Sequence, residues 1–187
     1  MDCRSLGIGD FFVPAQDAVI FSGVFMKIFL QKFFAFVVVG AWFAADYFSK
    51  IWAQSELANG VVMRLTSWME FKLAFNKGAA FSLFADGGGW QRWFFMGVAI
   101  LIGLWLCYAI LFERTTGLVR FAYASILGGA IGNLYDRVMH GMVTDFISWH
   151  IGNAYWPTFN VADVGICMGV GFLIIAWLVE WRAGSRL

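Results

Sequence analysis

The stretch from Gly128 to Asp163 holds the residues whose types and spacing best fit a chemical role. Within an otherwise apolar region it contains three carboxylates and one arginine, namely Asp136, Asp145, Asp163 and Arg137, and its asparagines include Asn133 and Asn160. A carboxylate in apolar surroundings costs free energy unless it is paired or used. We therefore expect these side chains to form a polar cluster with a structural or a catalytic purpose.

Asp145 and Asp163 are the candidates for a catalytic pair of carboxylates. Two aspartates that share one water can hydrolyse a peptide bond, because the ionised one takes a proton from the water and the protonated one donates to the scissile carbonyl. Repulsion between the two carboxylates raises one pKa, so that the pair holds one proton. The spacing assigns neither role to either residue.

Other polar residues could support such a pair or serve only the fold. Arg137 could orient a carboxylate or the substrate backbone. The asparagines could bind substrate carbonyls or hold the aspartates, and these are Asn76, Asn133 and Asn160. The alternative is structural: Asp163 lies near the start of an expected helix, where a carboxylate is favoured in any case, and Asp136 could simply pair with Arg137.

Other catalytic centres find little support in the sequence. The only histidines are His140 and His150, and there is no HExxH motif, which argues against a zinc peptidase. No GxSxG motif of a serine hydrolase occurs. We predict neither a metal nor a cofactor.

The composition is that of an integral membrane protein. Of the 187 residues, 61% are hydrophobic and 13% are charged, which is about half the charged fraction of a soluble domain. The net charge of +1 gives no reason to expect a nucleic-acid partner. We expect membrane lipids around a monomer.

Four apolar segments predict transmembrane helices at about 28–47, 93–112, 118–135 and 161–181. At 1.5 Å per residue, about twenty residues cross a hydrocarbon core of roughly 30 Å. Arg120 is expected to snorkel at the start of the third span, and Trp149, Tyr155 and Trp156 to lie at the membrane interface. Residues 1–25 form an N-terminal extension that could be dispensable, and residues 26–187 form a single membrane domain.

Residues 61–76 change from a helical to an alternating pattern. Apolar residues fall on odd positions and polar residues on even positions, with a break at Ser67 and Trp68. That alternation predicts strands. The predicted fold is therefore a mainly α membrane protein of four transmembrane helices with a small β-sheet between the first two spans.

The four crossings bring distant residues to one face of the membrane. Each crossing changes sides, so the loop at 48–92 and the loop at 136–160 lie on the same side, together with Asp46 and the polar cluster. Asp46 and Lys50 are four residues apart and can pair on one helix face. Lysines and arginines number seven on the side of the termini and six on the other, and the short loops favour cytoplasmic termini.

At this point the motifs resemble those of the lipoprotein signal peptidase family, also called signal peptidase II. Five segments follow in that family's order: DYFSK at 46–50, NKGAAF at 76–81, GNLYDR at 132–137, VTDF at 143–146 and FNVAD at 159–163. Each is weak alone, but the five in order, together with four spans, are specific. They cover about residues 26–181.

The resemblance implies a membrane aspartyl endopeptidase. It would remove the signal peptide of a diacylglyceryl-modified prolipoprotein, cleaving before the lipid-modified cysteine, with Asp145 and Asp163 as the catalytic pair. Supporting or substrate-binding positions would be Asp46, Lys50, Asn76, Gly78, Asn133, Asp136, Arg137 and Asn160. It also implies a location in the bacterial inner membrane, with cytoplasmic termini and an active site towards the periplasm or outer leaflet. On the periplasmic side it implies a sheet that forms a cradle and a short helix in the loop before the fourth span. The extension at 1–25 departs from the pattern.

Two other functions stay open on the residues alone. A proton-coupled transporter could use Asp136 and Asp163 as a relay, but it predicts polar residues across the bilayer, and spans two and four are almost purely apolar. A structural membrane subunit without chemistry predicts that Asp145→Asn alters stability only.

Overall fold

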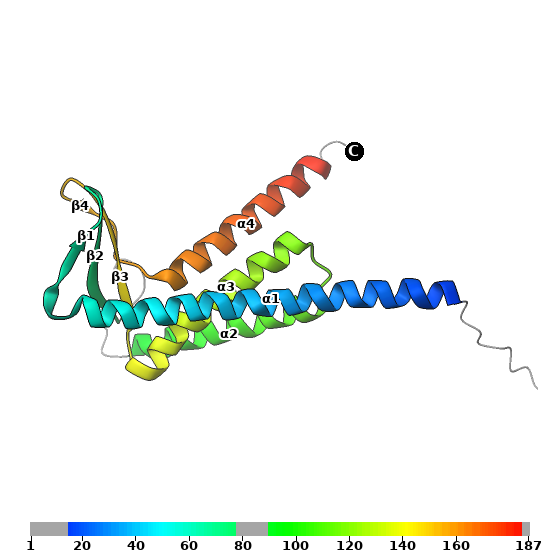
Figure 1. Cartoon of the computed structure of the whole chain (residues 1–187), viewed down its shortest axis with the longest axis horizontal. Coiled ribbons are helices and arrows are strands. Elements are labelled where there is room, and N and C mark those ends of the chain that lie inside the picture. The colour runs from blue at the N-terminus through cyan, green and yellow to red at the C-terminus, as the bar shows by residue number, and fades with distance from the viewer. Residues whose placement is uncertain (1–14, 78–89, 185–187) are drawn as a thin grey trace, which may run out of the picture.

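The computed structural model describes residues 15–77 and 90–184, and it places a small sheet at one end of a group of helices (Figure 1). The helices are α1 (Ala15–Glu56), α2 (Trp90–Phe112), α3 (Gly117–His140) and α4 (Val161–Gly184), with a short 3-10 turn, η2 (Ala58–Gly60). The strands are β1 (Val62–Arg64), β2 (Met69–Asn76), β3 (Val143–Ile151) and β4 (Ala154–Tyr155). The sheet stands where α1 ends and α4 begins.

Three helical segments are long and apolar enough to cross a membrane: Met26–Glu56, Trp90–Phe112 and Val161–Gly184. They confirm a mainly helical membrane protein. The first helix is longer than the predicted 28–47, because it continues past the membrane-length apolar run to Glu56. Towards the N-terminus it begins at Ala15, so part of the predicted extension is continuous with α1 and the helix has no break at Met26.

Helix α3 is less apolar than the other three because it lies among them. It packs against α1, α2 and α4, and most of its buried positions are small or polar residues. Arg120 is one of them, with only 5% of its surface exposed. The prediction that Arg120 snorkels is therefore wrong, since its side chain is enclosed between α3 and α1.

Glycines let α3 approach its neighbours closely. A methyl group at Gly132 would collide with the carboxylate of Asp46 on α1, and one at Gly129 would collide with the backbone carbonyl of Ala162 on α4. Small residues on facing surfaces allow such contacts between membrane helices. The bundle is therefore tightest where α3 carries the polar residues of the candidate site.

The sheet is antiparallel with strand order β1-β2-β3-β4. Strand β2 pairs with β3 from Met69 opposite Trp149 to Asn76 opposite Val143, with one irregularity between Phe71 and Ala74. These strands confirm the alternation predicted for 61–76, and the chain turns at the predicted break between β1 and β2. One face of the sheet packs on the end of α1 through Ala53, Leu57 and Phe146.

The short helix expected before the fourth span does not form. Residues 143–151 and 154–155 are strands instead. Val143–Ile151 is rich in β-branched and aromatic residues, which favour extended backbone. Its backbone also pairs with β2, which would otherwise present an unpaired edge. Phe159 then pairs with Ile147 and leads the chain into α4.

Candidate active site

Asp145 and Asp163 reach the same cavity from two different elements. Asp145 lies on β3 and is 3% exposed, whereas Asp163 lies in the first turn of α4. Both line a cavity of about 1180 Å³ between the sheet and the bundle. The structure thus brings the two residues to one cavity, and their catalytic role stays a prediction.

Asn160, immediately before α4, connects the two aspartates. Its side-chain Nδ2 donates to Asp145 Oδ1 at 2.7 Å. Its Oδ1 accepts a hydrogen bond from the backbone N–H of Asp163 at 3.0 Å, and its own N–H donates to Asp163 Oδ2 at 3.2 Å. The last two bonds form a reciprocal cap at the start of the helix. The same residue therefore caps α4 and fixes both carboxylates.

Asn133, on α3, holds Asp163 from the other side. Its Nδ2 donates to Asp163 Oδ1 at 2.8 Å. Its Oδ1 accepts from Asn160 Nδ2 at 3.0 Å and from Lys50 Nζ at 3.2 Å. The amide orientation of Asn133 is thereby set by two donors on one atom, which leaves its own N–H group directed at Asp163.

A buried ion cluster beneath the cavity contains Lys50, Asp46 and Asp136. Lys50 Nζ lies 2.7 Å from Asp46 Oδ2 and 3.1 Å from Asp136 Oδ2, and Lys50 is only 4% exposed. With Asn133 as the third acceptor, all three hydrogens of the ammonium group have a partner. The expected pairing of Asp46 with Lys50 is confirmed. Asp136 shares the Lys50 ammonium group with Asp46.

The two carboxylates of this cluster also hold the backbone next to the candidate pair. Asp46 Oδ1 accepts from the N–H of Ala162 at 2.8 Å, and Asp136 Oδ2 accepts from the N–H of Thr144 at 2.9 Å. Thr144 precedes Asp145 in the chain, and Ala162 precedes Asp163. The ion cluster therefore positions one aspartate through β3 and the other through α4.

The remaining predicted residues border the cavity or lie outside the described ranges. Asn76, at the end of β2, and Arg137, on α3, both line the cavity. The Arg137 guanidinium donates to the carbonyl of Asn133 at 3.2 Å and lies 5.5 Å from the ring centre of Phe95. Gly78 lies outside the described residues.

Burial and, to a smaller extent, the nearby negative charge of Asp163 raise the pKa of Asp145 to about 7. Hydrogen bonds from Asn160 and Asn76 and the charge of Lys50 act in the opposite direction. A carboxyl group with a pKa near neutrality can accept or donate a proton at ordinary pH. The environment therefore matches the shared proton expected for a pair of aspartates.

Sequence reasoning did not assign several residues that the structure places at the site. Thr144 is 2% exposed and its Oγ1 accepts from Gln54 Nε2 on α1 at 2.8 Å. The signal in the sequence that points to Thr144 is its position next to Asp145. Trp149, Tyr155 and Trp156 were predicted at the membrane interface, and they line the cavity, which their spacing alone did not indicate.

The described residues contain no group of three or more histidine, cysteine, aspartate or glutamate side chains that could hold a metal ion. What the site does contain is two carboxylates at one cavity, one with a pKa near 7, beside a bundle whose helices include three that can cross a membrane. Fold and site together define the class as a membrane hydrolase of the aspartic type.

Comparison with known proteins identifies the family. A family model described as signal peptidase (SPase) II matches residues 38–179. The lipoprotein signal peptidase of Dichelobacter nodosus is 51% identical over 143 residues, which cover 76% of this chain and 92% of the relative. That of Azoarcus sp. is 43% identical over 150 residues, covering 80% and 84%. A bacterial membrane enzyme solved by the in meso method at 2.3 Å resolution aligns with a TM-score of 0.70 and 26% identity over 78% of this chain and 88% of that one. The chain belongs to the signal peptidase II family.

Proposed function

We propose that this chain is an aspartic endopeptidase that removes the signal peptide from diacylglyceryl-modified prolipoproteins, cleaving before the lipid-modified cysteine. The observation that carries the proposal is the hydrogen bonding of Asn160 to both Asp145 and Asp163 at the wall of one cavity. Family membership supplies the substrate class, because the relatives are named lipoprotein signal peptidases.

In the proposed mechanism, the two carboxylates act on one water. The ionised carboxylate takes a proton from the water, which attacks the scissile carbonyl, and the protonated carboxylate donates its proton to the developing oxyanion. The proton taken from the water then passes to the leaving amine as the C–N bond breaks. One hydroxyl of the tetrahedral intermediate returns its proton to the carboxylates as the new carbonyl forms, so that the pair again shares one proton. The pKa of Asp145 near 7 keeps that proton available at ordinary pH, and the two roles belong to the pair rather than to one residue.

The neighbouring residues would orient the pair rather than react. Asn133 and Asn160 direct N–H groups at the carboxylates, and Lys50 holds Asn133. Preorganised hydrogen bonds of this kind need no rearrangement during the reaction. We assign Asp46, Lys50 and Asp136 as positioning residues, and Asn76 and Arg137 as residues that contact the substrate.

The cavity suits a substrate that is part peptide and part lipid. Its lining includes polar groups near the aspartates and apolar side chains further along α4, among them Ile166 and Met168. Aromatic side chains such as Trp149 and Trp156 complete the wall on the sheet side. An acylated cysteine could therefore place its acyl chains against α4 while its peptide bond reaches the carboxylates.

We also propose that all four helices cross the membrane, with the sheet and the aspartates on the periplasmic side and both termini in the cytoplasm. The support is that α3 runs between helices that each qualify as spans. Single cysteines on a background without native cysteines test this: Ser55→Cys, at the sheet end, should react with an impermeant maleimide on intact cells, and Arg114→Cys, between α2 and α3, should not. The reverse labelling pattern would mean that the orientation in the membrane is the opposite one. Labelling of both cysteines would contradict four spans.

Cleavage of a diacylglyceryl-modified prolipoprotein in detergent micelles tests the activity. The unaltered chain should release the signal peptide, and Asp145→Asn and Asp163→Asn should each lose about 10²–10⁴-fold in rate, the range that acid–base catalysis contributes. Glu56→Gln is the matched control, because Glu56 is an exposed carboxylate near the same end of α1. It should cleave at the normal rate.

The outcomes separate catalysis from stability. If Asp145→Asn cleaves as fast as the unaltered chain, Asp145 is not in the pair. If a well-folded unaltered chain does not cleave under conditions that support another lipoprotein signal peptidase, the proposed substrate is wrong. Thermal unfolding of each variant shows whether a loss of rate has a cause other than unfolding.

A further inference from the structure

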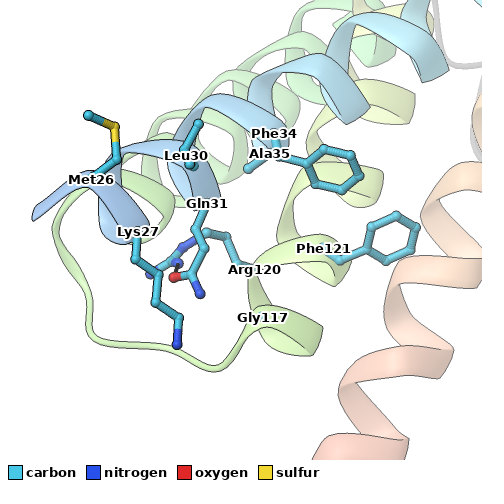
Figure 2. Close-up of a pocket in the computed structure, with 9 residues that line it drawn as sticks. All are labelled: Met26, Lys27, Leu30, Gln31, Phe34, Ala35, Gly117, Arg120 and Phe121. Atoms are coloured by element: carbon cyan, nitrogen blue, oxygen red, sulfur yellow. Dashed lines mark hydrogen bonds between the residues drawn. The ribbon is translucent and has the colours of Figure 1, made fainter. Parts of the chain in front are cut away.

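A second cavity lies at the other end of the bundle, between the start of α3 and the N-terminal part of α1 (Figure 2). Its volume is about 610 Å³, and no residue lines both this cavity and the one at the aspartates. Lys27, Gln31 and Arg120 lie together at one part of it, and Phe34 and Phe121 lie at another. We call it the Arg120 pocket.

Arg120 is a buried cation without a matching anion in the described part of the chain. Its Nη1 donates to the neutral Oε1 of Gln31 at 2.7 Å, and its Nε has no hydrogen-bond partner. A buried charge is costly unless an opposite charge and hydrogen bonds compensate it. With 5% of Arg120 exposed, water cannot supply that compensation fully. The pocket thus lacks one negatively charged acceptor.

Two further features of the pocket favour an anion. Lys27 lines it and forms no ion pair within the described ranges, so a second positive charge is available. Helix α3 begins at Gly117, which also lines the pocket, after the capping residue Thr116. The N-terminus of a helix carries partial positive charge and free N–H groups. Arginine, lysine and helix end together form a site typical of phosphate binding.

The other walls of the pocket are apolar, and this favours the phosphate group of a lipid over a soluble phosphate. Leu30, Phe34 and Phe121 line it next to the cations. Along α1, Lys27 is about 28 Å from Asp46 at 1.5 Å per residue, close to the thickness of a hydrocarbon core. The cations therefore lie at the membrane boundary opposite the aspartates, where phospholipid headgroups are found.

We propose that the Arg120 pocket binds an anionic phospholipid of that leaflet. The phosphodiester accepts hydrogen bonds from the guanidinium of Arg120 and the ammonium of Lys27, and an acyl chain lies along Leu30, Phe34 and Phe121. The bound lipid would join α1 to α3 at the end of the bundle that carries no sheet. Lipid binding at this pocket does not depend on the peptidase activity, and it is measured directly as retention of the lipid.

The test is native mass spectrometry of the full chain in detergent, with phosphatidylglycerol or phosphatidylcholine of identical acyl chains. The unaltered chain should retain phosphatidylglycerol in preference. Arg120→Gln should weaken its retention about tenfold, which corresponds to ~1.4 kcal/mol. Arg114→Gln is the matched control, because it removes the same charge from an exposed position between α2 and α3, and it should retain the lipid normally.

Gln31→Glu keeps the test decisive if Arg120→Gln does not fold. A carboxylate at position 31 would neutralise Arg120 from within the protein, so this variant should be as stable as the unaltered chain or more stable, and it should lose phosphatidylglycerol. Normal retention by Gln31→Glu, equal retention of phosphatidylcholine, or equal losses in Arg120→Gln and Arg114→Gln would each overturn the proposal. Full competition by soluble glycerophosphate would also overturn it, because the acyl chain would then contribute nothing.

Discussion

Asp145 should make the folded protein less stable as the pH rises, and Asp145→Asn should remove that effect. The residue is buried beside Asp163, and both conditions favour its protonated form. Asparagine resembles the protonated aspartate in shape and charge. Its side-chain oxygen can still accept the N–H of Asn160, and its NH₂ group can donate to Asp163. The substitution therefore removes the charge without removing the hydrogen bonds.

The sign and size of the effect follow from the two pKa values of Asp145. Burial and Asp163 raise the pKa from 3.8 to about 7 in the folded state. Between these values the folded chain keeps a proton that the unfolded chain has lost, so stability falls as the pH rises. The full difference is about 4 kcal/mol at 1.36 kcal/mol per pH unit. From about pH 4.5 to about pH 8, the advantage of Asp145→Asn should grow by about 3 kcal/mol, or roughly 6–12 °C in Tm.

Intrinsic tryptophan fluorescence during heating provides the assay, since the chain has ten tryptophans. The Tm of Asp145→Asn minus that of the unaltered chain should increase with pH and level off above neutrality. Glu56→Gln removes an exposed carboxylate instead and serves as the control, with only a small difference in Tm expected. A constant difference for Asp145→Asn over the whole range would refute the reasoning, because it would mean that Asp145 has an ordinary pKa.

Three further predictions concern the surroundings of the pair. Lys50→Met should lower the free energy of unfolding by about 3–5 kcal/mol, because it leaves two carboxylates buried without their cation; denaturant unfolding measures this, and a loss below about 1 kcal/mol would show that the cluster is solvated. Gly132→Ala should destabilise the protein by about 1–3 kcal/mol through collision with the Asp46 carboxylate. Gly97→Ala, where a methyl group meets nothing within 4 Å, is its control and should be neutral or stabilising, and equal losses in both would point to the backbone rather than the contact. Signal-peptide release should continue at the same rate in EDTA, and inhibition that added Zn²⁺ or Mg²⁺ reverses would contradict a mechanism by two carboxylates alone.

Local patterns in the sequence predicted the features that depend on local periodicity. The alternation at 61–76 gave strands β1 and β2 because a half-buried strand must alternate its faces. The four-residue spacing of Asp46 and Lys50 predicted their ion pair, which the structure contains. The order of the apolar segments also predicted that Asp145 and Asp163 would meet, since each crossing reverses the side of the chain.

Features that depend on neighbours in space were not predictable from those patterns. Strand β3 forms because β2 offers it a hydrogen-bonding edge, and the sequence of 143–151 alone does not show that partner. Arg120 looks like a snorkelling residue at the start of a span, and only the position of α1 encloses it. The bonds of Asn160 to residues on three elements likewise arise from packing.

The origin of the two aspartates in different parts of the fold has a consequence for inhibition. Asp145 is carried by the sheet and Asp163 by the helical bundle, and the sheet stands at one end of that bundle (Figure 1). The proposed catalytic geometry is therefore a property of the junction, and it exists only while the sheet is docked. A molecule that wedges between β3 and the start of α4 would separate the carboxylates and stop the reaction without binding to either of them. Resistance to such a molecule could arise at residues of that junction other than the two aspartates.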